Sequence, residues 1–183
     1  MKSKYIYIVF CIFLLAFSNT YSFDGERNGF ILGGGIGGGY LMNSSSDKFA
    51  SDTDSKAVFL THFKIGYAPS NTLEVYYLNN VSWWGVSDVT FSLGLSALAV
   101  TFYTDTKTET GFSISGGLGL STLSAPFEQD LKSSSGFGLF FGGGYEFASH
   151  WNVELDLLYS TISEGNNNLT SFGIQLTING LAY

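Results

Sequence analysis

Cysteine, proline and basic side chains are all scarce in this sequence of 183 residues. It contains one Cys, two Pro, and eight Lys and Arg against 15 Asp and Glu. A nucleic-acid-binding protein needs a basic face, so the acidic balance argues against that class. Charged residues make up only 13% of the chain, whereas an ordinary soluble domain has about 25%. Disordered chains have few aromatics, and here 17% of the residues are aromatic, so disorder is excluded as well.

Long hydrophobic runs are also missing, with one exception at the N-terminus. Two lysines within the first four residues precede 13 apolar residues, 5–17. That run is shorter than the stretch of about 20 that a membrane-spanning helix needs. Small residues then offer a cleavage site before Phe23. The pattern predicts a secretory signal peptide over residues 1–22 and a mature domain over 23–183. Because Cys11 lies in the first segment, we expect the mature protein to have no disulfide.

What the sequence has instead is strict alternation of apolar and small or polar side chains. This period of two is typical of a strand with one apolar face. Eight segments show it: residues 30–42, 59–67, 73–77, 91–99, 112–120, 137–147, 153–159 and 172–178. In the fourth, the apolar face is assigned to Phe91, Leu93, Leu95, Ala97 and Ala99. No window has sustained helical spacing, so the expected class is all-β with eight strands.

The connections between these segments differ in length. Three are long and polar, residues 43–55, 122–135 and 161–168, and two are short, residues 69–71 and 149–151. The connection at residues 81–88 is shorter and more aromatic than the long group. Short turns at one end and long loops at the other are typical of bacterial outer-membrane barrels.

The second face of each strand distinguishes a membrane barrel from a soluble one. A soluble barrel such as a lipocalin points bulky apolar groups inward and keeps a polar exterior. Here the second face is Gly, Ser and Thr with a few carboxylates, which suits the narrow interior of eight strands. Aromatics gather near the strand ends, as in interfacial girdles. We therefore predict an eight-stranded antiparallel up-and-down transmembrane β-barrel. The alternative is an exported soluble lipocalin-like barrel that binds an apolar ligand.

Several short stretches resemble the small OmpA/OmpX-like outer-membrane barrels. They are Gly29-Phe30 before a Gly-rich first strand, the run from Gly142 to Phe147, and the run from Trp151 to Leu155. The terminal aromatic Tyr183 is similar to the C-terminal signal read by the outer-membrane assembly machinery. This resemblance implies a bacterial outer-membrane location, contact with lipid and lipopolysaccharide, and function carried by extracellular loops whose partners are unknown.

The last strand departs from the pattern of that family. Its apolar positions are even-numbered through Ile178, whereas Leu181 and Tyr183 are odd-numbered. Either a bulge near Gly180 corrects the phase, or the C-terminal signal is weakened.

Some eight-stranded barrels modify lipid A, which would require a Ser, a His and an orienting carboxylate. His62 is expected inward beside Lys64, and His150 falls in a short turn next to Ser149. Adjacent residues on a strand point opposite ways, so Ser149 and His150 would form a poor catalytic pair. We predict that the protein is not an enzyme.

Metal and cofactor sites are not indicated either. The acidic residues Asp47, Asp52 and Asp54 share one loop, and Glu128 and Asp130 share another. Neither loop has the fixed ligand spacing of a calcium site. The glycine runs lack the Lys-Ser or Lys-Thr that follows a phosphate-binding loop.

Charged residues on the inward faces predict one buried network. A three-residue turn between the sixth and seventh segments would place Glu146 opposite Glu154. Like charges facing each other are destabilising. Lys64 is the one cation placed deep on an inward face, and Glu74, expected opposite Gly66, is its diagonal neighbour. We predict that Lys64, Glu74, Glu146 and Glu154 close the lumen near its periplasmic end. The alternative is that these side chains reach periplasmic water.

Overall fold

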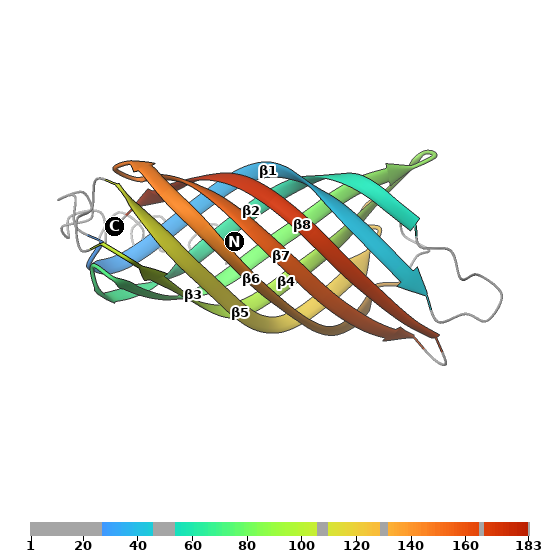
Figure 1. Cartoon of the computed structure of the whole chain (residues 1–183). Helices are drawn as coiled ribbons and strands as arrows, with labels where there is room; N and C mark the ends of the chain where they lie inside the picture. Colours follow the sequence, from blue (N-terminus) through green and yellow to red (C-terminus); the bar gives the residue numbers. More distant parts are fainter. Residues whose placement is uncertain (1–26, 46–53, 106–109, 129–131, 165–166, 183) are drawn as a thin grey trace, which may run out of the picture.

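The computed structural model describes residues 27–45, 54–105, 110–128, 132–164 and 167–182. Within them, eight strands close into one antiparallel barrel in chain order, and β1 pairs with β8 (Figure 1). The strands are β1 (Gly29–Ser45), β2 (Asp54–Ser70), β3 (Leu73–Val86), β4 (Val89–Tyr103), β5 (Gly111–Ser124), β6 (Ser134–Ala148), β7 (Trp151–Glu164) and β8 (Asn167–Ala182). No helix in the described residues is long and apolar enough to cross a membrane.

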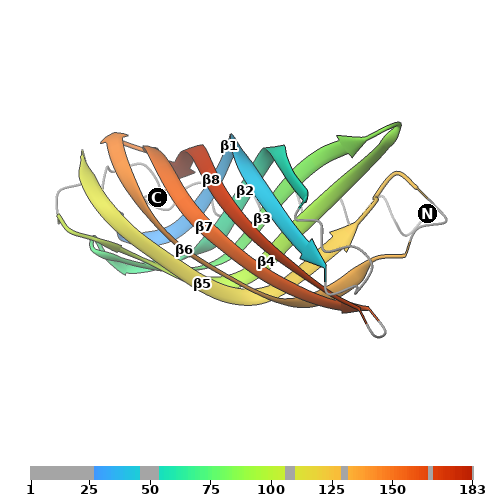
Figure 2. The same ribbon diagram turned by 45° about the vertical axis from the view of Figure 1, so that its right-hand side comes forward.

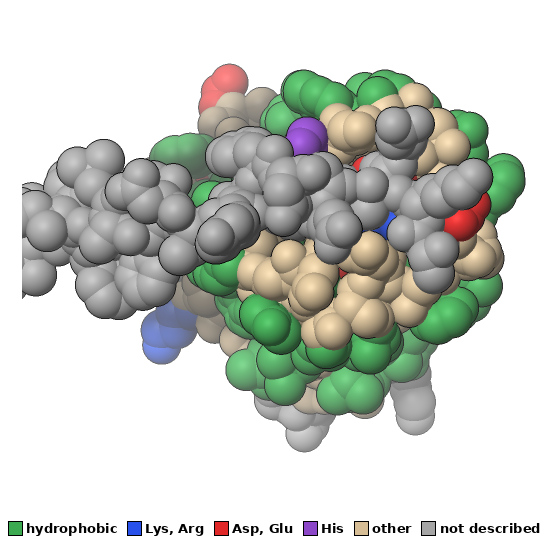
Figure 3. Space-filling view, turned by 90° about the vertical axis from the view of Figure 1, so that its left-hand side faces the viewer, with side chains coloured by type: hydrophobic (Ala, Val, Ile, Leu, Met, Phe, Trp, Pro, Cys, Tyr) green, Lys and Arg blue, Asp and Glu red, His purple; other side chains and the backbone are tan. Residues whose placement is uncertain are grey.

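Alternation along each strand determines what faces outward. On β5, Phe112, Ile114, Leu118 and Leu120 are between 51% and 66% exposed, while Ser113, Ser115 and Ser121 are buried. The same pattern holds on β1, β2, β6 and β8, where outward Phe, Ile, Leu and Tyr side chains alternate with inward residues that are mostly Gly or polar, with apolar exceptions such as Leu41, Leu60 and Phe140. Seen from one end, hydrophobic side chains ring the barrel (Figure 3). Because the sheet is closed, no strand edge exposes its backbone groups to lipid. The apolar side chains on the outside suit the same environment.

Strand β4 is the exception, and the face predicted for it is wrong. Leu93, Leu95, Ala97 and Ala99 are buried inside the barrel. The outward residues of the same strand are Ser92, Gly94 and Ser96, followed by the exposed Leu98, Val100 and Phe102. Both faces of β4 therefore carry apolar residues, and alternation alone could not tell which one faces the lipid.

Two connections are tighter than predicted. Strands β3 and β4 continue pairing to Val86 and Val89, so Ser87 and Asp88 form a two-residue turn in place of the predicted connection 81–88. Ser87 has a φ of 54°, a left-handed conformation that a tight hairpin turn requires. The β3–β4 hairpin projects at the same end of the barrel as the long connections (Figure 2). Strands β7 and β8 likewise pair to Glu164 and Asn167, which shortens the predicted loop 161–168.

The turns at the opposite end also shift from the predicted positions. Strand β2 runs to Ser70, with an irregular register between Tyr67 and Ser70, and Asn71 and Thr72 form the turn. Gly66 therefore faces Tyr76 rather than Glu74. Ser149 and His150 form the β6–β7 turn, and His150 adopts a φ of 70°.

The C-terminal strand keeps its register to the end, without the bulge considered near Gly180. Gly180 pairs with Gly34 and Leu181 with Gly33. Leu181 consequently faces inward and is buried against Ile31 and Ala68. The predicted signal residue Tyr183 lies outside the described residues, as does the predicted signal peptide.

Candidate functional site in the barrel lumen

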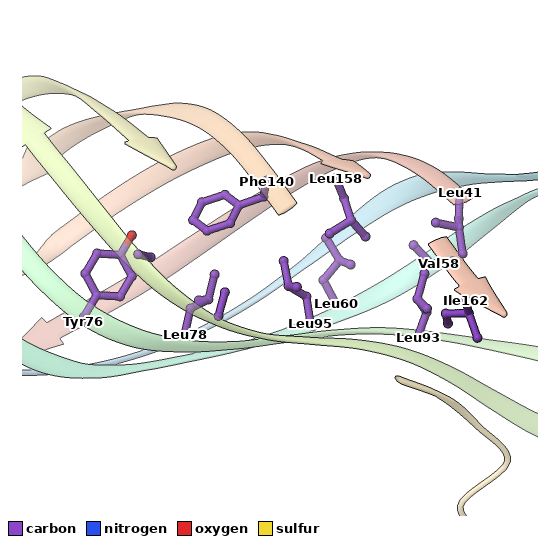
Figure 4. Packing of buried hydrophobic residues seen from close by; sticks show 12 residues of the cluster. Leu41, Val58, Leu60, Tyr76, Leu78, Leu93, Leu95, Phe140, Leu158 and Ile162 are labelled. Atoms are coloured by element: carbon purple, nitrogen blue, oxygen red, sulfur yellow. The ribbon is translucent and has the colours of Figure 1, made fainter. Parts of the chain in front are cut away.

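Inward side chains fill the barrel in two parts that differ in chemistry. The part toward the β3–β4 hairpin holds an apolar cluster, with side chains from six strands pointing toward one another (Figure 4). Its buried members are Leu41, Val58, Leu60, Tyr76, Leu78, Leu93, Leu95, Ala97, Ala99, Phe140, Leu158 and Ile162. Buried Asn80, Gln175 and Ser82 lie beside it in the lumen, where Asn80 donates to Gln175 and Gln175 donates to Ser82. The polar lumen expected from the Gly, Ser and Thr face therefore shares the interior with this apolar cluster. The inverted face of β4 supplies four members of this cluster.

Lys64 is at the centre of the polar part. Its Nζ lies 3.3 Å from Glu74 Oε2 and 3.7 Å from Glu154 Oε1. The same ammonium lies 4.9 Å from the centroid of the Tyr76 ring. Lys64 is 1% exposed, and Glu74 and Glu154 are 0% and 3% exposed. A buried ammonium needs such partners because no bulk water solvates its charge.

Glu154 is held by amides as well as by the lysine. Asn152 donates to its Oε1 at 2.9 Å, and Asn179 donates to its Oε2 at 3.0 Å. Asn179 also donates to Asn152 Oδ1 at 2.9 Å, so the two amides orient each other. His62 Nδ1 lies 3.7 Å from Glu154 Oε2. The sequence placed His62 inward correctly but did not indicate the two amides.

Glu146 has a different cation as its partner, Arg27, which precedes β1. Arg27 Nη2 lies 2.6 Å from Glu146 Oε2, and Arg27 Nε donates to the same oxygen at 2.7 Å. Arg27 Nη1 donates to the backbone oxygens of Asn71 and Asp105 at 3.2 and 3.3 Å. Arg27 is fully buried, and its guanidinium lies 3.9 Å from the centroid of the Tyr103 ring. This side chain thus ties strand β6 to the β2–β3 turn and to the β4–β5 connection at one end of the barrel.

Tyr103 links the two charged clusters. Its ring contacts Arg27, and its hydroxyl donates to Glu74 Oε1 at 3.1 Å. Among the residues that the structure describes, the polar part of the lumen therefore contains two cations, Arg27 and Lys64, with the buried carboxylates Glu74, Glu146, Glu154 and Asp156. Asp156 Oδ1 is buried without a hydrogen-bond partner among the described residues.

Of the four residues predicted to form the network, the structure brings Lys64, Glu74 and Glu154 together. The predicted pairing of Glu146 with Glu154 is wrong. A register irregularity between Glu146 and Ala148 places Glu146 opposite Asn152 and Glu154 opposite Gly144. Arg27 was missed because it lies outside the alternating segments, and only its position just before the first strand could have indicated it.

Other candidate sites can be placed as well. Ser149 and His150 lie side by side in the β6–β7 turn. Across the described residues, no group of three His, Cys, Asp or Glu side chains is close enough to hold a metal ion. Asp47, Asp52 and Asp130 lie outside the described residues.

A closed eight-stranded sheet with an apolar exterior and a filled interior defines an integral membrane β-barrel. The family model of the outer membrane protein beta-barrel domain matches residues 89–182, and the chain belongs to that family. It is an outer-membrane protein of bacteria. No curated protein sequence matches the chain significantly.

Solved structures show the same architecture at low sequence identity. Neisserial surface protein A is 16% identical, with a TM-score of 0.52 over 84% of this chain and 97% of that one. Ail, the attachment invasion locus protein of Yersinia pestis, is 13% identical, with a TM-score of 0.49 over 83% and 99% of the two chains. OprG of Pseudomonas aeruginosa is 18% identical, with a TM-score of 0.43 over 87% and 97%. The likeness to Neisserial surface protein A supports a shared fold.

Proposed function

We propose that this outer-membrane barrel is a non-conducting scaffold that acts through its extracellular end. The filled lumen is the observation that carries this proposal. An ion crossing the barrel would have to displace the Lys64 and Arg27 clusters and then pass the apolar cluster that contains Leu60, Leu95 and Phe140. The polar groups beside that cluster, Asn80, Gln175 and Ser82, are already hydrogen-bonded to one another. Transfer of an unpaired ion into such an environment is strongly unfavourable.

The end of the barrel that carries the β3–β4 hairpin has features suited to contact with another molecule. Phe127 is 74% exposed in the β5–β6 connection, and Val86 is 48% exposed at the tip of the β3–β4 hairpin. Trp84 stacks on Phe91 with ring centroids 6.0 Å apart, and Lys56 Nζ lies 5.5 Å from the Trp84 centroid. Trp84, Phe91 and Lys56 are partly buried, whereas Phe127 and Val86 are exposed. Aromatic residues are enriched at interaction surfaces.

Catalysis is not part of this proposal. A lipid-modifying site would need a His, a Ser and a carboxylate that converge on the outer face. His62 is buried in the lumen beside Glu154, and His150 shares a two-residue turn with Ser149. These positions favour structural roles for both histidines.

The proposal extends to processing and assembly. We infer that residues 1–22 are a signal peptide and that Tyr183 contributes to recognition by the outer-membrane assembly machinery. We also infer that lipopolysaccharide surrounds the outward side chains in the outer leaflet. The signal peptide rests on the short apolar run after two lysines. The recognition signal rests on the aromatic Tyr183 alone, because the final strand has no bulge that would bring this residue into phase with Ile178.

The purified, folded barrel is expected to give no stable ion conductance in a planar lipid bilayer. Buried side chains from all eight strands occupy both parts of the lumen, so we expect no continuous water path across the membrane. A general porin inserted under the same conditions serves as the positive control, and the heat-dependent gel shift of folded barrels confirms that the sample is intact. Uniform, long-lived current steps from the folded protein would contradict the proposal.

The orientation of the barrel predicts which end can be labelled from outside. An even number of strands puts both ends of the barrel sequence at one end, with the β2–β3 and β6–β7 turns, and export leaves that end periplasmic. A thiol reagent that cannot cross the membrane should label Ser133→Cys but not Ser70→Cys in intact cells. Both positions are exposed, so they form a matched pair once the cells are lysed. Labelling of Ser70→Cys alone would invert the orientation.

A further inference from the structure

The outer face of the barrel is hollowed where β1 meets β8. The hollow is an open groove with a volume of about 430 Å³, and we call it the seam groove. Gly34 and Gly180 pair across the seam and form its floor. Phe63 pairs with Gly34 on one side, and Trp151 pairs with Gly180 on the other. A floor without side chains therefore lies between two aromatic edges.

The hollow exists because two positions that have room for a side chain carry none. A Cβ built at Gly34 would meet no atom closer than a β2 backbone oxygen at 3.6 Å. At Gly180 the nearest atoms are two carbons of the Trp151 ring, both at 3.8 Å. The inward Gly35 differs, because a β8 backbone oxygen lies 2.6 Å from its Cβ position. Close approach of the strands thus explains Gly35 but not the two outward glycines.

The location and width of the seam groove limit what can fill it. Its edges belong to the apolar exterior, where Phe63 is 44% and Trp151 is 50% exposed, so the groove opens to lipid. The floor is two strands wide, and neighbouring strands lie about 4.8 Å apart. A helix is about 10–12 Å across with its side chains, so it is too broad to reach the floor between the aromatic edges. A single hydrocarbon chain is narrow enough.

The end of the groove at the β6–β7 turn is chemically different. Among the described residues that line the groove, His150 alone has a polar side chain. Its backbone oxygen accepts a hydrogen bond from Leu181 N at 2.8 Å, which holds the turn against the end of β8. An imidazole can donate a hydrogen bond to a phosphate oxygen. Trp151 follows directly, and tryptophan is enriched at the level of the lipid headgroups.

We propose that the seam groove binds one phospholipid of the periplasmic leaflet. An acyl chain lies over Gly34 and Gly180, and the phosphate lies beside His150. The choice of leaflet rests on the orientation proposed above, which places the β6–β7 turn at the periplasmic end. Cysteine labelling tests that orientation separately, so its failure is distinguishable from failure to bind a phospholipid.

Native mass spectrometry of the barrel, extracted from outer membranes in mild detergent, tests the binding. The parent is expected to retain one phospholipid per chain. Gly34→Leu fills the groove and should lower the retained fraction at least about fivefold, because the acyl chain loses its apolar contacts. The matched control is Gly38→Leu, at an outward glycine of β1 that does not line the groove and has 3.8 Å of free space at its Cβ. It should retain the lipid, and all three proteins should show the heat-dependent gel shift.

Three results of this experiment would overturn the proposal. The first is a folded parent that carries no phospholipid. The second is equal retention by the parent and Gly34→Leu. The third is lipopolysaccharide or another protein chain, a second copy included, bound in place of the phospholipid and lost in Gly34→Leu.

A fluorescence titration tests the contact with the phosphate. Replacing Trp83 and Trp84 with Phe leaves Trp151, at the groove, as the reporter among the three tryptophans. In dodecyl maltoside micelles, dibrominated phosphatidylglycerol should quench Trp151 at a lower concentration than dibrominated diacylglycerol, which lacks the phosphate. His150→Gly tolerates the φ of 70° and removes the imidazole. It should raise the half-saturating concentration of the phospholipid at least about fivefold and leave that of diacylglycerol unchanged. Equal values for the two lipids in the parent, or for the phospholipid in parent and variant, would overturn the proposal.

Discussion

Replacing Lys64 with alanine is expected to lower the free energy of unfolding of the barrel by about 3–5 kcal/mol. The change leaves Glu74 and Glu154 buried without the cation that lies 3.3 and 3.7 Å from their carboxylate oxygens. Uncompensated buried charge is more destabilising than the loss of an exposed ion pair, which is worth about 0–1 kcal/mol. Urea unfolding in detergent micelles, followed by tryptophan fluorescence, measures the difference.

A second substitution identifies the source of that loss. Adding Glu154→Gln to Lys64→Ala should restore part of the stability, because it removes one of the stranded charges. Adding Glu146→Gln should restore none, since Glu146 pairs with Arg27 and its loss strands that guanidinium. Lys132→Ala, at an exposed position before β6, is the control and should unfold like the parent. A Lys64→Ala barrel as stable as the parent would show that the lumen charges are solvated.

The barrel itself could be predicted from the sequence because the alternation of outward and inward side chains is a local pattern. Outward and inward side chains alternate along a strand, so Phe112, Ile114 and Ser113 reveal their faces without knowledge of the neighbouring strands. Strand β4 shows where this pattern fails. Its residues 97–102 are apolar at almost every position, and only the partners across the sheet determine that Leu98 faces lipid and Ala97 the lumen.

The lumen cluster was predictable only in part, for a related reason. Lys64 could be placed inward by counting positions along β2. The partners of Glu146 depend on register, and one irregularity near Ala148 moves Glu146 from Glu154 to Asn152. Arg27 is beyond the reach of any periodicity argument, because its side chain enters the barrel from a segment that precedes the first strand.

Gly37→Ala is expected to weaken closure of the barrel between β1 and β8. Gly37 faces inward and pairs with Thr177, and a Cβ built there would lie 2.8 Å from Thr177 Cα and 2.9 Å from the backbone carbon of Leu176. Backbone atoms cannot rotate away as a flexible side chain can, so the two strands must separate. Overpacking of this kind costs about 1–3 kcal/mol, and here it acts on the strand pair that closes the sheet. The fraction with the folded gel mobility and the urea midpoint should both fall.

Gly38→Ala provides the matched control one residue away. Gly38 points to the lipid, and a Cβ there would meet its nearest atom, the Val58 backbone oxygen, at 3.8 Å. The added methyl group fits without any shift and reduces the freedom of the unfolded chain, so stability should be unchanged or rise by about 0.4–1 kcal/mol. Opposite effects at adjacent glycines would show that close approach of β8, rather than glycine content, limits substitution along β1. Equal effects at the two positions would contradict that explanation.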